Sequence, residues 1–276
     1  MTMPPLLPLV KKGLQSAALA LVDGCFAVLP RVQPEAEKLR RCKLVSHRGE
    51  HDNVRVLENT LAAFDVLVER GVWGMECDFR WTRDLHPVVV HDPDCRRLFG
   101  KSLGIGELTL AQLRKEVPLI PTLAEVVARY GKKLHLMVEI KEEVYPDPHY
   151  QSARLEQIFA PLLPQQDYHL LSLNPNMFKY LDFLPPQALL PVAELNLRSL
   201  SRTAIEGGLK GISGHFWLLS DARLRRHHQL SQAVGTGFIA SKNALFREIN
   251  RDVDWIFTNH ALELQAILDR LLAPQR

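Results

Sequence analysis

The feature that most constrains this chain is a regular alternation of short apolar runs and amphipathic stretches from residue 43 onward. Helix-like stretches, such as residues 59–71 and 221–232, separate runs that have the length and composition of buried strands. The eight candidate strands are residues 43–47, 74–79, 134–140, 168–173, 189–195, 211–216, 235–240 and 254–259. This alternation predicts a parallel sheet with helices outside it, and eight strands favour a closed (β/α)8 TIM barrel. A doubly wound open sheet is the alternative.

Length and composition agree with a barrel. The 276 residues, 46% of them hydrophobic, supply a sizeable core, and such barrels commonly need about 250 residues. The net charge of +3 is small, so we expect no nucleic-acid partner, whereas a phosphate ligand or an anionic membrane fits. The cysteines have no CxxC spacing and predict free thiols in a reducing compartment, such as a bacterial cytoplasm, with or without membrane association. They are Cys25, Cys42, Cys77 and Cys95.

We expect residues 1–40 to form an N-terminal helical segment and residues 41–276 to form the barrel domain. Lys11 and Lys12 precede an apolar run from residue 14 to residue 29, which Asp23 interrupts. The run is short and charged for a membrane span, which needs about 20 apolar residues. Three interpretations remain: a helix packed on the domain, an interfacial helix that makes peripheral membrane contact, or a cleaved signal peptide. Nothing in the sequence predicts the oligomeric state.

Polar side chains gather near the C-terminal ends of the candidate strands, where barrel enzymes build their sites. Polar loops explain several of these residues, but not Glu139, which stands inside the apolar run LMVEI. The strand-end groups are His47 and Arg48, Glu76 and Asp78, Glu139 and Lys141, Ser172 and Asn174, Glu194 and Asn196, His215, Ser241 and Lys242, and Thr258 and Asn259.

The run VVVHD at residues 88–92 is expected to be the second arm of a β-hairpin that rises from the second strand. Only seven residues separate Phe79 from Pro87, too few for a crossover helix. A turn centred on residues 84–85 would set Asp78 opposite His91, with Glu76 on the same face. The hairpin would then bring His91 back beside the two carboxylates.

Three carboxylates form a candidate metal site. Glu76 and Asp78 are two residues apart on one strand and therefore share a face. Two adjacent carboxylates repel each other unless a cation or a proton joins them. Glu139 can add a third from another strand, and such a set suits Mg²⁺ or Ca²⁺. Ion pairs with nearby arginines or with Lys141 are the structural alternative.

Histidines and cations accompany these carboxylates. His47 and His91 can act as general base and general acid on opposite sides of a phosphorus atom. Arg48 can hold phosphate oxygens in a bidentate fork, and Lys141 shares strand parity with Glu139, so it can meet the same phosphate. Glu58 lies close enough in sequence to join the site. The set indicates metal-assisted cleavage of a phosphodiester.

Five short motifs, taken in order, resemble the glycerophosphodiester phosphodiesterase family. They are His47-Arg48-Gly49, Glu58-Asn59-Thr60, Glu76-Cys77-Asp78, His91-Asp92 and Glu139-Ile140-Lys141. The strong resemblance covers roughly residues 43–143. It implies a (β/α)8 barrel that cleaves glycerophosphodiesters to glycerol 3-phosphate and an alcohol. It also implies that Glu76, Asp78 and Glu139 bind Mg²⁺ or Ca²⁺, that His47 and His91 are the acid–base pair, and that Arg48 and Lys141 hold the phosphate.

The chain departs from the family pattern at several positions. Leu57 and Leu85 stand where the family usually has proline and glycine, and Asn259 stands where it usually has aspartate. Phe238 falls where the family often has a Trp-Thr-Val strand beside the glycerol, so we expect Phe238 to be an accessory residue of the pocket. These differences leave two alternatives open: a phospholipase D- or C-like enzyme acting on lysolipids, and a non-catalytic barrel that binds phosphate or lipid.

Overall fold

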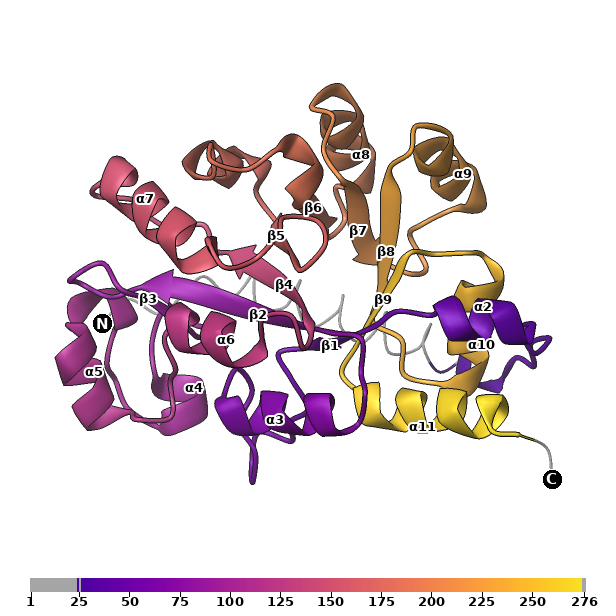
Figure 1. The fold of residues 1–276 in the computed structure, drawn as a ribbon, viewed down its shortest axis with the longest axis horizontal. Helices are drawn as coiled ribbons and strands as arrows, with labels where there is room; N and C mark the ends of the chain where they lie inside the picture. Colours follow the sequence, from indigo (N-terminus) through magenta and orange to yellow (C-terminus); the bar gives the residue numbers. More distant parts are fainter. Residues whose placement is uncertain (1–23, 25, 275–276) are drawn as a thin grey trace, which may run out of the picture.

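The chain folds into a closed barrel of eight parallel strands in a computed structural model that describes residues 24 and 26–274. The barrel closes because β1 pairs with both β9 and β2. Its strands are β1 (Leu44–His47), β2 (Gly74–Trp81), β4 (His135–Ile140), β5 (Tyr168–Ser172), β6 (Leu189–Ala193), β7 (Gly211–His215), β8 (Ala233–Gly237) and β9 (Trp255–Thr258). The expected (β/α)8 barrel is confirmed and the open sheet is wrong (Figure 1).

Helices surround the strands on the outside of the barrel (Figure 1). The principal ones are α3 (Leu61–Glu69), α6 (Leu123–Tyr130), α7 (Pro148–Phe159), α8 (Leu197–Glu206), α9 (Asp221–Gln229), α10 (Lys242–Asn250) and α11 (Ala261–Leu272). Two short 3₁₀ helices, η2 (Pro175–Tyr180) and η3 (Pro186–Ala188), follow β5 in place of an α-helix. The strand expected at residues 235–240 begins two residues earlier, at Ala233.

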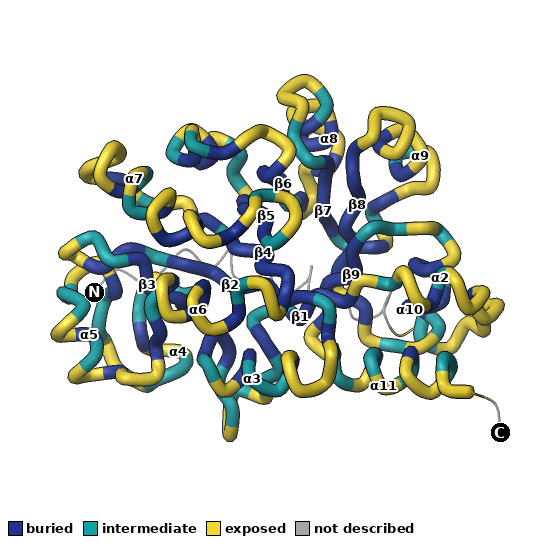
Figure 2. The backbone as a smooth tube through the Cα atoms, viewed as in Figure 1, coloured by how far each residue is buried: buried dark blue, intermediate teal, exposed yellow. Residues whose placement is uncertain are grey.

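Burial follows the layers of the barrel, with buried strands inside and exposed outer helix faces (Figure 2). Val45, Met137, Leu171, Leu190 and Phe257 form part of one buried cluster contributed by strands around the barrel. Side chains of this kind fill the interior of a small barrel, which is therefore a packed core rather than a pore. Cys42, Cys77 and Cys95 are free thiols, as expected, and Cys25 lies outside the described residues.

The β2–β3 hairpin forms as expected, but its predicted register is wrong by one residue. β3 (Pro87–Val89) pairs antiparallel with β2, with Phe79 opposite Val89. The turn contains three residues rather than two, because Leu85 adopts a left-handed backbone with a φ of 58°. Asp78 therefore faces Val90, whose N–H donates to the Asp78 carbonyl (3.0 Å). His91 lies beyond the end of β3, where strand parity no longer sets its direction.

A small helical insertion follows the hairpin and has no counterpart in the sequence prediction. It contains α4 (Arg96–Phe99), η1 (Ile105–Glu107) and α5 (Leu110–Glu116). Its own apolar core includes Val90, Ile105 and Leu113. Figure 1 shows α4 and α5 at one side of the barrel, near β3. The insertion brings α4 close to the strand ends that carry the candidate site.

The segment before the barrel is described only in part. Its helix α2 (Ala36–Arg41) packs against α10 and α11. The three interpretations of residues 1–40 concern mainly residues 1–23, which lie outside the described residues. Within residues 24 and 26–274, no helix is both long and apolar enough to cross a membrane.

Candidate active site

The strand register brings the predicted site residues together at the C-terminal end of the barrel. His47 at the end of β1 lies beside Glu76 of β2, and Asp78 of β2 lies beside Glu139 of β4. Since β1, β2 and β4 are neighbours, three separate sequence segments converge on one edge. This edge opens into a cavity of about 460 Å³ that His47, Glu76 and Glu139 help to line.

The three carboxylates form a buried cluster. Glu76, Asp78 and Glu139 each place a carboxylate oxygen within 4.8 Å of the other two. Burial raises the pKa of Glu76 well above its usual value, and repulsion from Asp78 and Glu139 adds to this effect. Burial and Asp78 also raise the pKa of Glu139. A divalent cation would relieve this repulsion, and oxygen donors of this kind suit Mg²⁺ or Ca²⁺. The donor set therefore fits such an ion.

Two cations already lie against the carboxylates. The Lys141 ammonium is 2.6 Å from oxygens of both Asp78 and Glu139, and Arg48 Nε is 3.3 Å from Asp78 Oδ2. Burial alone would raise the pKa of Asp78, but Lys141 and Arg48 outweigh burial and hold that pKa below its usual value. Asp78 is thus the best neutralised of the three, and the excess negative charge falls on Glu76 and Glu139.

The turn after β1 directs Arg48 towards the cluster. Arg48 and Gly49 both have a left-handed backbone, with φ values of 60° and 82°. A Cβ on Gly49 would lie 2.7 Å from the Ala63 Cβ of α3, so only glycine permits this approach. The Arg48 N–H donates to Glu76 Oε2 (3.2 Å). Its guanidinium reaches Glu58 (2.9 Å).

His47 and His91 both line the cavity, and each has a partner on Nδ1. His47 Nδ1 lies 2.7 Å from Asn259 Oδ1, and His47 Nε2 lies 3.8 Å from Glu76 Oε2. Burial and the adjacent Arg48 lower the pKa of His47 to about 4. His91 Nδ1 lies 2.8 Å from Asp92 Oδ1. Burial also lowers the pKa of His91, although Asp78 and Asp92 oppose the change.

Arg97 of the helical insertion links Glu58 to Asp92 behind His91. Its guanidinium donates to both Glu58 oxygens (2.5 and 3.0 Å) and to Asp92 Oδ2 (2.6 Å). Burial alone would raise the pKa of Glu58, but Arg97 and Arg48 lower it to about 2. Glu58 is therefore an ionised support for Arg48 and Arg97. The sequence analysis placed Glu58 near the site but missed Arg97, which no local pattern distinguishes.

Asn59 and Thr60, just before α3, have different roles. Thr60 is the N-cap and its side chain accepts from the Ala63 N–H. Asn59 instead donates to Asp78 Oδ2 (2.9 Å) and accepts from the Asp78 N–H (3.3 Å). Asn59 has a φ of 58°, a conformation that asparagine tolerates better than most residues. It therefore fixes the orientation of the Asp78 carboxylate.

The opposite wall of the cavity carries mainly apolar side chains, of which the sequence analysis expected only Phe238, together with the polar strand-end residues Glu194 and His215. Phe238 lies at the cavity and its ring meets the His47 ring edge-on, with centroids 4.6 Å apart. Other apolar lining residues come from β5, β6 and the loops after β5, β6 and β7: Leu171, Leu173, Val192, Leu195 and Leu218. The cavity thus joins an ionic wall from β1, β2 and β4 to a mainly apolar wall from β5–β8, in which Glu194, Ser213 and His215 are the polar members. We call this second side the apolar wall.

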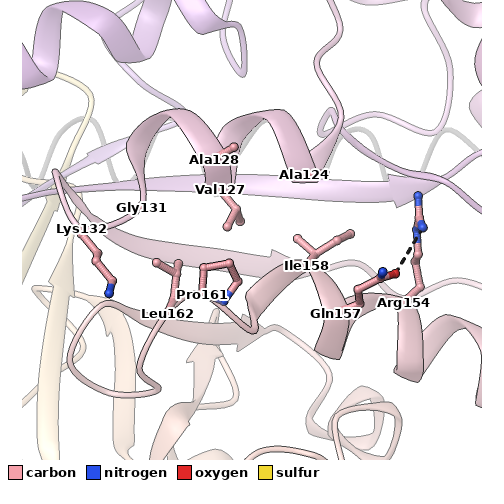
Figure 3. Close-up of a pocket in the computed structure, with 10 residues that line it drawn as sticks. All are labelled: Ala124, Val127, Ala128, Gly131, Lys132, Arg154, Gln157, Ile158, Pro161 and Leu162. Atoms are coloured by element: carbon pink, nitrogen blue, oxygen red, sulfur yellow. Dashed lines mark hydrogen bonds between the residues drawn. The ribbon is translucent and has the colours of Figure 1, made fainter.

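A second, larger hollow lies on the outside of the barrel between α6 and α7 (Figure 3). Its volume is about 600 Å³, and its polar lining includes Lys132, Arg154 and Gln157. Arg154 donates to Gln157 (3.5 Å), shown as the dashed line in Figure 3. No carboxylate or histidine lines this hollow among the described residues. Size alone therefore does not locate the reactive site.

Fold and site together define a (β/α)8 barrel with a buried polyanionic centre and two flanking histidines at its C-terminal end. The chain belongs to the glycerophosphoryl diester phosphodiesterase family, because the model of that family matches residues 47–261.

Individual relatives match over shorter stretches. A glycerophosphodiester phosphodiesterase of Caldanaerobacter subterraneus is 35% identical over 117 residues, which cover 37% of this chain and 47% of the relative. Human glycerophosphodiester phosphodiesterase 1 is 35% identical over 102 residues, covering 32% of this chain and 30% of the relative. The matched stretch therefore spans less than half the length of these curated relatives.

Solved structures support the fold over most of the chain. A glycerophosphodiester phosphodiesterase from Thermotoga maritima superposes with a TM-score of 0.69 at 20% identity, covering 82% of this chain and 98% of that one. An Oleispira antarctica phosphodiesterase, in complex with its product sn-glycerol-3-phosphate, gives a TM-score of 0.69 at 20% identity, with coverages of 82% and 96%. At these identities the likeness establishes the barrel alone.

Proposed function

We propose that this protein is a divalent-cation-dependent phosphodiesterase that hydrolyses glycerophosphodiesters to glycerol 3-phosphate and an alcohol. The observation that carries the proposal is the convergence of three buried carboxylates, two histidines and two cations on one cavity. The family supports the substrate class. So does the Oleispira antarctica neighbour, which was solved with glycerol 3-phosphate.

Glu76, Asp78 and Glu139 would hold Mg²⁺ or Ca²⁺. When bound, the cation supplies positive charge that stabilises the extra negative charge on the phosphoryl oxygens in the transition state. Arg48 and Lys141 are proposed to hold the same oxygens. The pKa of Lys141 stays above its usual value because Asp78 and Glu139 outweigh the effect of burial, so Lys141 is positively charged at neutral pH.

The two histidines are proposed to divide the proton transfers. Asn259 Oδ1 accepts a hydrogen bond from His47 Nδ1–H. The neutral His47 ring therefore carries its proton on Nδ1, and Nε2 is free to accept one. With a pKa of about 4, His47 is neutral at pH 7 and suits the general base that takes a proton from the attacking water. Asp92 accepts from His91 Nδ1 and opposes the lowering of the His91 pKa by burial, so it favours the imidazolium form that a general acid needs. His91 then donates its Nε2 proton to the leaving alcohol oxygen as the P–O bond breaks.

A second candidate substrate is a lysophospholipid, cleaved at the same phosphodiester. The apolar wall favours it, because Leu173, Leu195 and Phe238 offer an acyl chain a surface that a small polar head group does not need. On this proposal the ionic wall and its chemistry are unchanged. Only the alcohol or the acyl-glycerol portion differs.

The test is product release from glycerophosphocholine and from lysophosphatidylcholine, each with Mg²⁺, with Ca²⁺ and with EDTA. Metal-dependent glycerol 3-phosphate from the first substrate supports the principal proposal. Metal-dependent hydrolysis of the lysolipid alone supports the second. A folded protein that cleaves neither substrate would contradict both and favour a barrel that only binds phosphate or lipid.

A further inference from the structure

Exposed apolar side chains gather at the same end of the barrel as the cavity. The loops that follow five successive strands of the sheet, β4 to β8, each carry one large apolar side chain that is 40–83% exposed. We call these residues the apolar rim: Val144, Leu173, Leu195, Trp217 and Phe238. Because the strands are adjacent, the rim forms an arc around one half of the barrel mouth.

The opposite end of the same strands is less apolar. Among the described residues, the loops that lead into β4–β8 carry two comparable side chains, Leu163 and Leu230, which are 54% and 50% exposed. Single exposed leucines are ordinary on a protein surface. Five large apolar groups in one arc beside a cavity instead mark an interaction surface.

The apolar rim continues into the cavity. Leu173, Leu195 and Phe238 belong to both, since they line the cavity and are also exposed. Inside, the apolar surface extends to Val192 and Leu218. Apolar side chains therefore extend from the rim to Phe238, whose ring contacts His47.

The described start of the chain lies at this end as well. The Phe26 ring packs edge-on against Phe216, the residue before Trp217, with centroids 5.2 Å apart. Asn243, near the start of α10, donates to the Ala27 carbonyl (2.7 Å). The described part of the chain therefore begins next to the apolar rim.

Charges beside the rim show no excess of cations. The same loops and helix starts carry the exposed cations Lys179, Arg198 and Lys242 and the exposed anions Glu142, Asp147, Asp182, Glu194 and Asp221. A partner that needs strong electrostatic attraction, such as a highly anionic membrane, would require an excess of cations. The side chains present instead suit shallow insertion into a neutral interface, with tryptophan at the head-group level.

We propose that the apolar rim docks the C-terminal end of the barrel onto a zwitterionic lipid surface, so that the cavity opens towards the membrane. Only the identity of the substrate that the docked protein would cleave rests on the proposed function. Docking itself is measured without turnover, on vesicles of diacyl phosphatidylcholine.

The first test compares two double variants of the full chain in vesicle co-sedimentation. Val144→Ser/Trp217→Ser alters two rim residues that do not line the cavity. Leu163→Ser/Leu230→Ser is the matched control at the other end of the barrel. We expect the rim variant to lose at least about tenfold in partitioning, because two inserted apolar side chains are removed, and the control to lose less than about twofold. Raising the salt concentration is expected to leave binding unchanged.

An equal loss in both variants, or a rim variant that binds like the unaltered protein, would overturn the proposal. The second result would mean that residues before the barrel alone bind the vesicle. Hydrolysis of soluble glycerophosphocholine separates the two proposals. If the rim variant retains that activity but not vesicle binding, docking is supported. If the unaltered protein binds vesicles but cleaves no substrate, docking stands and the proposed function fails.

Trp217 is also a natural fluorescent reporter, because it is 54% exposed, whereas Trp81 and Trp255 are buried and Trp73, before β2 at the other end of the barrel, is only partly exposed. On vesicle binding we expect its emission to shift to the blue and to be quenched by brominated phosphatidylcholine. Trp217→Phe, which keeps an aromatic ring, should still bind vesicles but lose this signal. An emission that stays fully accessible to acrylamide in the bound state would place Trp217 in water and contradict the proposal.

Discussion

The two walls of the cavity come from the same positions of the barrel strands yet have opposite character. The ends of β1, β2 and β4 carry ionised groups that contact one another at hydrogen-bond distance, such as Lys141 with both Asp78 and Glu139. The ends of β5–β8 carry mainly apolar groups, such as Leu195 and Phe238, although Glu194 and His215 also lie there. We therefore expect the ionic wall to carry out the reaction and the apolar wall to select the substrate. Substitutions in the ionic wall should lower kcat, and those in the apolar wall should change which substrate is preferred.

The largest effect is expected for the two histidines. His47→Gln or His91→Gln removes one proton transfer, so kcat for glycerophosphocholine should fall roughly 10²–10⁴-fold. Thermal unfolding should change little, since neither ring belongs to the buried apolar core. His86→Gln is the control, because His86 lies at the hairpin turn and does not line the cavity. Either histidine variant keeping a tenth of the activity would contradict the proposed roles.

Substitutions of Glu76 and Asp78 should have opposite effects on the free energy of unfolding when no metal is present. Glu76 has a raised pKa, so its contribution to stability is present below its unfolded pKa and lost as pH rises through the folded value. At pH 7 in EDTA, Glu76→Gln should therefore raise the free energy of unfolding by about 1–3 kcal/mol. Asp78 has a lowered pKa, because Lys141 and Arg48 outweigh burial. Asp78→Asn should instead cost about 3–5 kcal/mol, because it removes the carboxylate that Lys141 and Arg48 share and leaves each buried cation with one fewer anionic partner.

Urea unfolding with EDTA and with Mg²⁺ measures both effects. The unaltered protein should gain stability from bound metal, and Glu76→Gln should lose most of that gain. A Glu76→Gln protein that is less stable than the unaltered one in EDTA would show that Glu76 is a structural partner of Arg48 rather than a ligand.

The ionic wall could be predicted from the residues themselves, whereas of the apolar wall only Phe238 was expected, and that from the family resemblance. Burying a carboxylate costs free energy unless a cation or hydrogen bonds compensate for it. Glu139 within an apolar strand, and Glu76 and Asp78 on one strand face, therefore indicate a site by themselves. Leu173 and Leu195 have no such signal, because leucine at the end of a strand is ordinary. Their role depends on which strands become neighbours after the barrel closes.

Two failures have specific physical causes. The hairpin register was wrong because Leu85 takes a left-handed conformation that leucine rarely adopts, which lengthens the turn by one residue. Arg97 was missed because its partner Glu58 is 39 residues away in the sequence, and an insertion with its own core brings the two together. His91 reaches the cavity despite the register shift, since it lies in the loop after β3.

Substituting Arg97 tests whether the residues behind His91 contribute to catalysis. Arg97→Ala should lower kcat about tenfold with little change in KM, because Asp92 and His91 lose their support while the phosphate contacts remain. It should also move the alkaline limb of the pH–rate profile, which reports loss of the proton from the general acid His91, and Arg97→Lys should restore part of the loss. The adjacent Arg96→Ala is the control, since Arg96 pairs only with Asp94 in the described structure, 3.8 Å apart. A change confined to stability would make Arg97 structural.

Phe238 stands where the two walls meet, and the smallest effect is expected there. Phe238→Ala removes apolar surface from the cavity but no charged group, so kcat/KM for lysophosphatidylcholine relative to glycerophosphocholine should fall about 3–10-fold. Phe238→Leu is the control, because it keeps an apolar side chain. If Phe238→Ala lowered kcat for both substrates equally, its edge-on contact with His47 would matter more than its contact with substrate. Phe238 would then belong to the ionic wall, and selection would begin only at β5–β7.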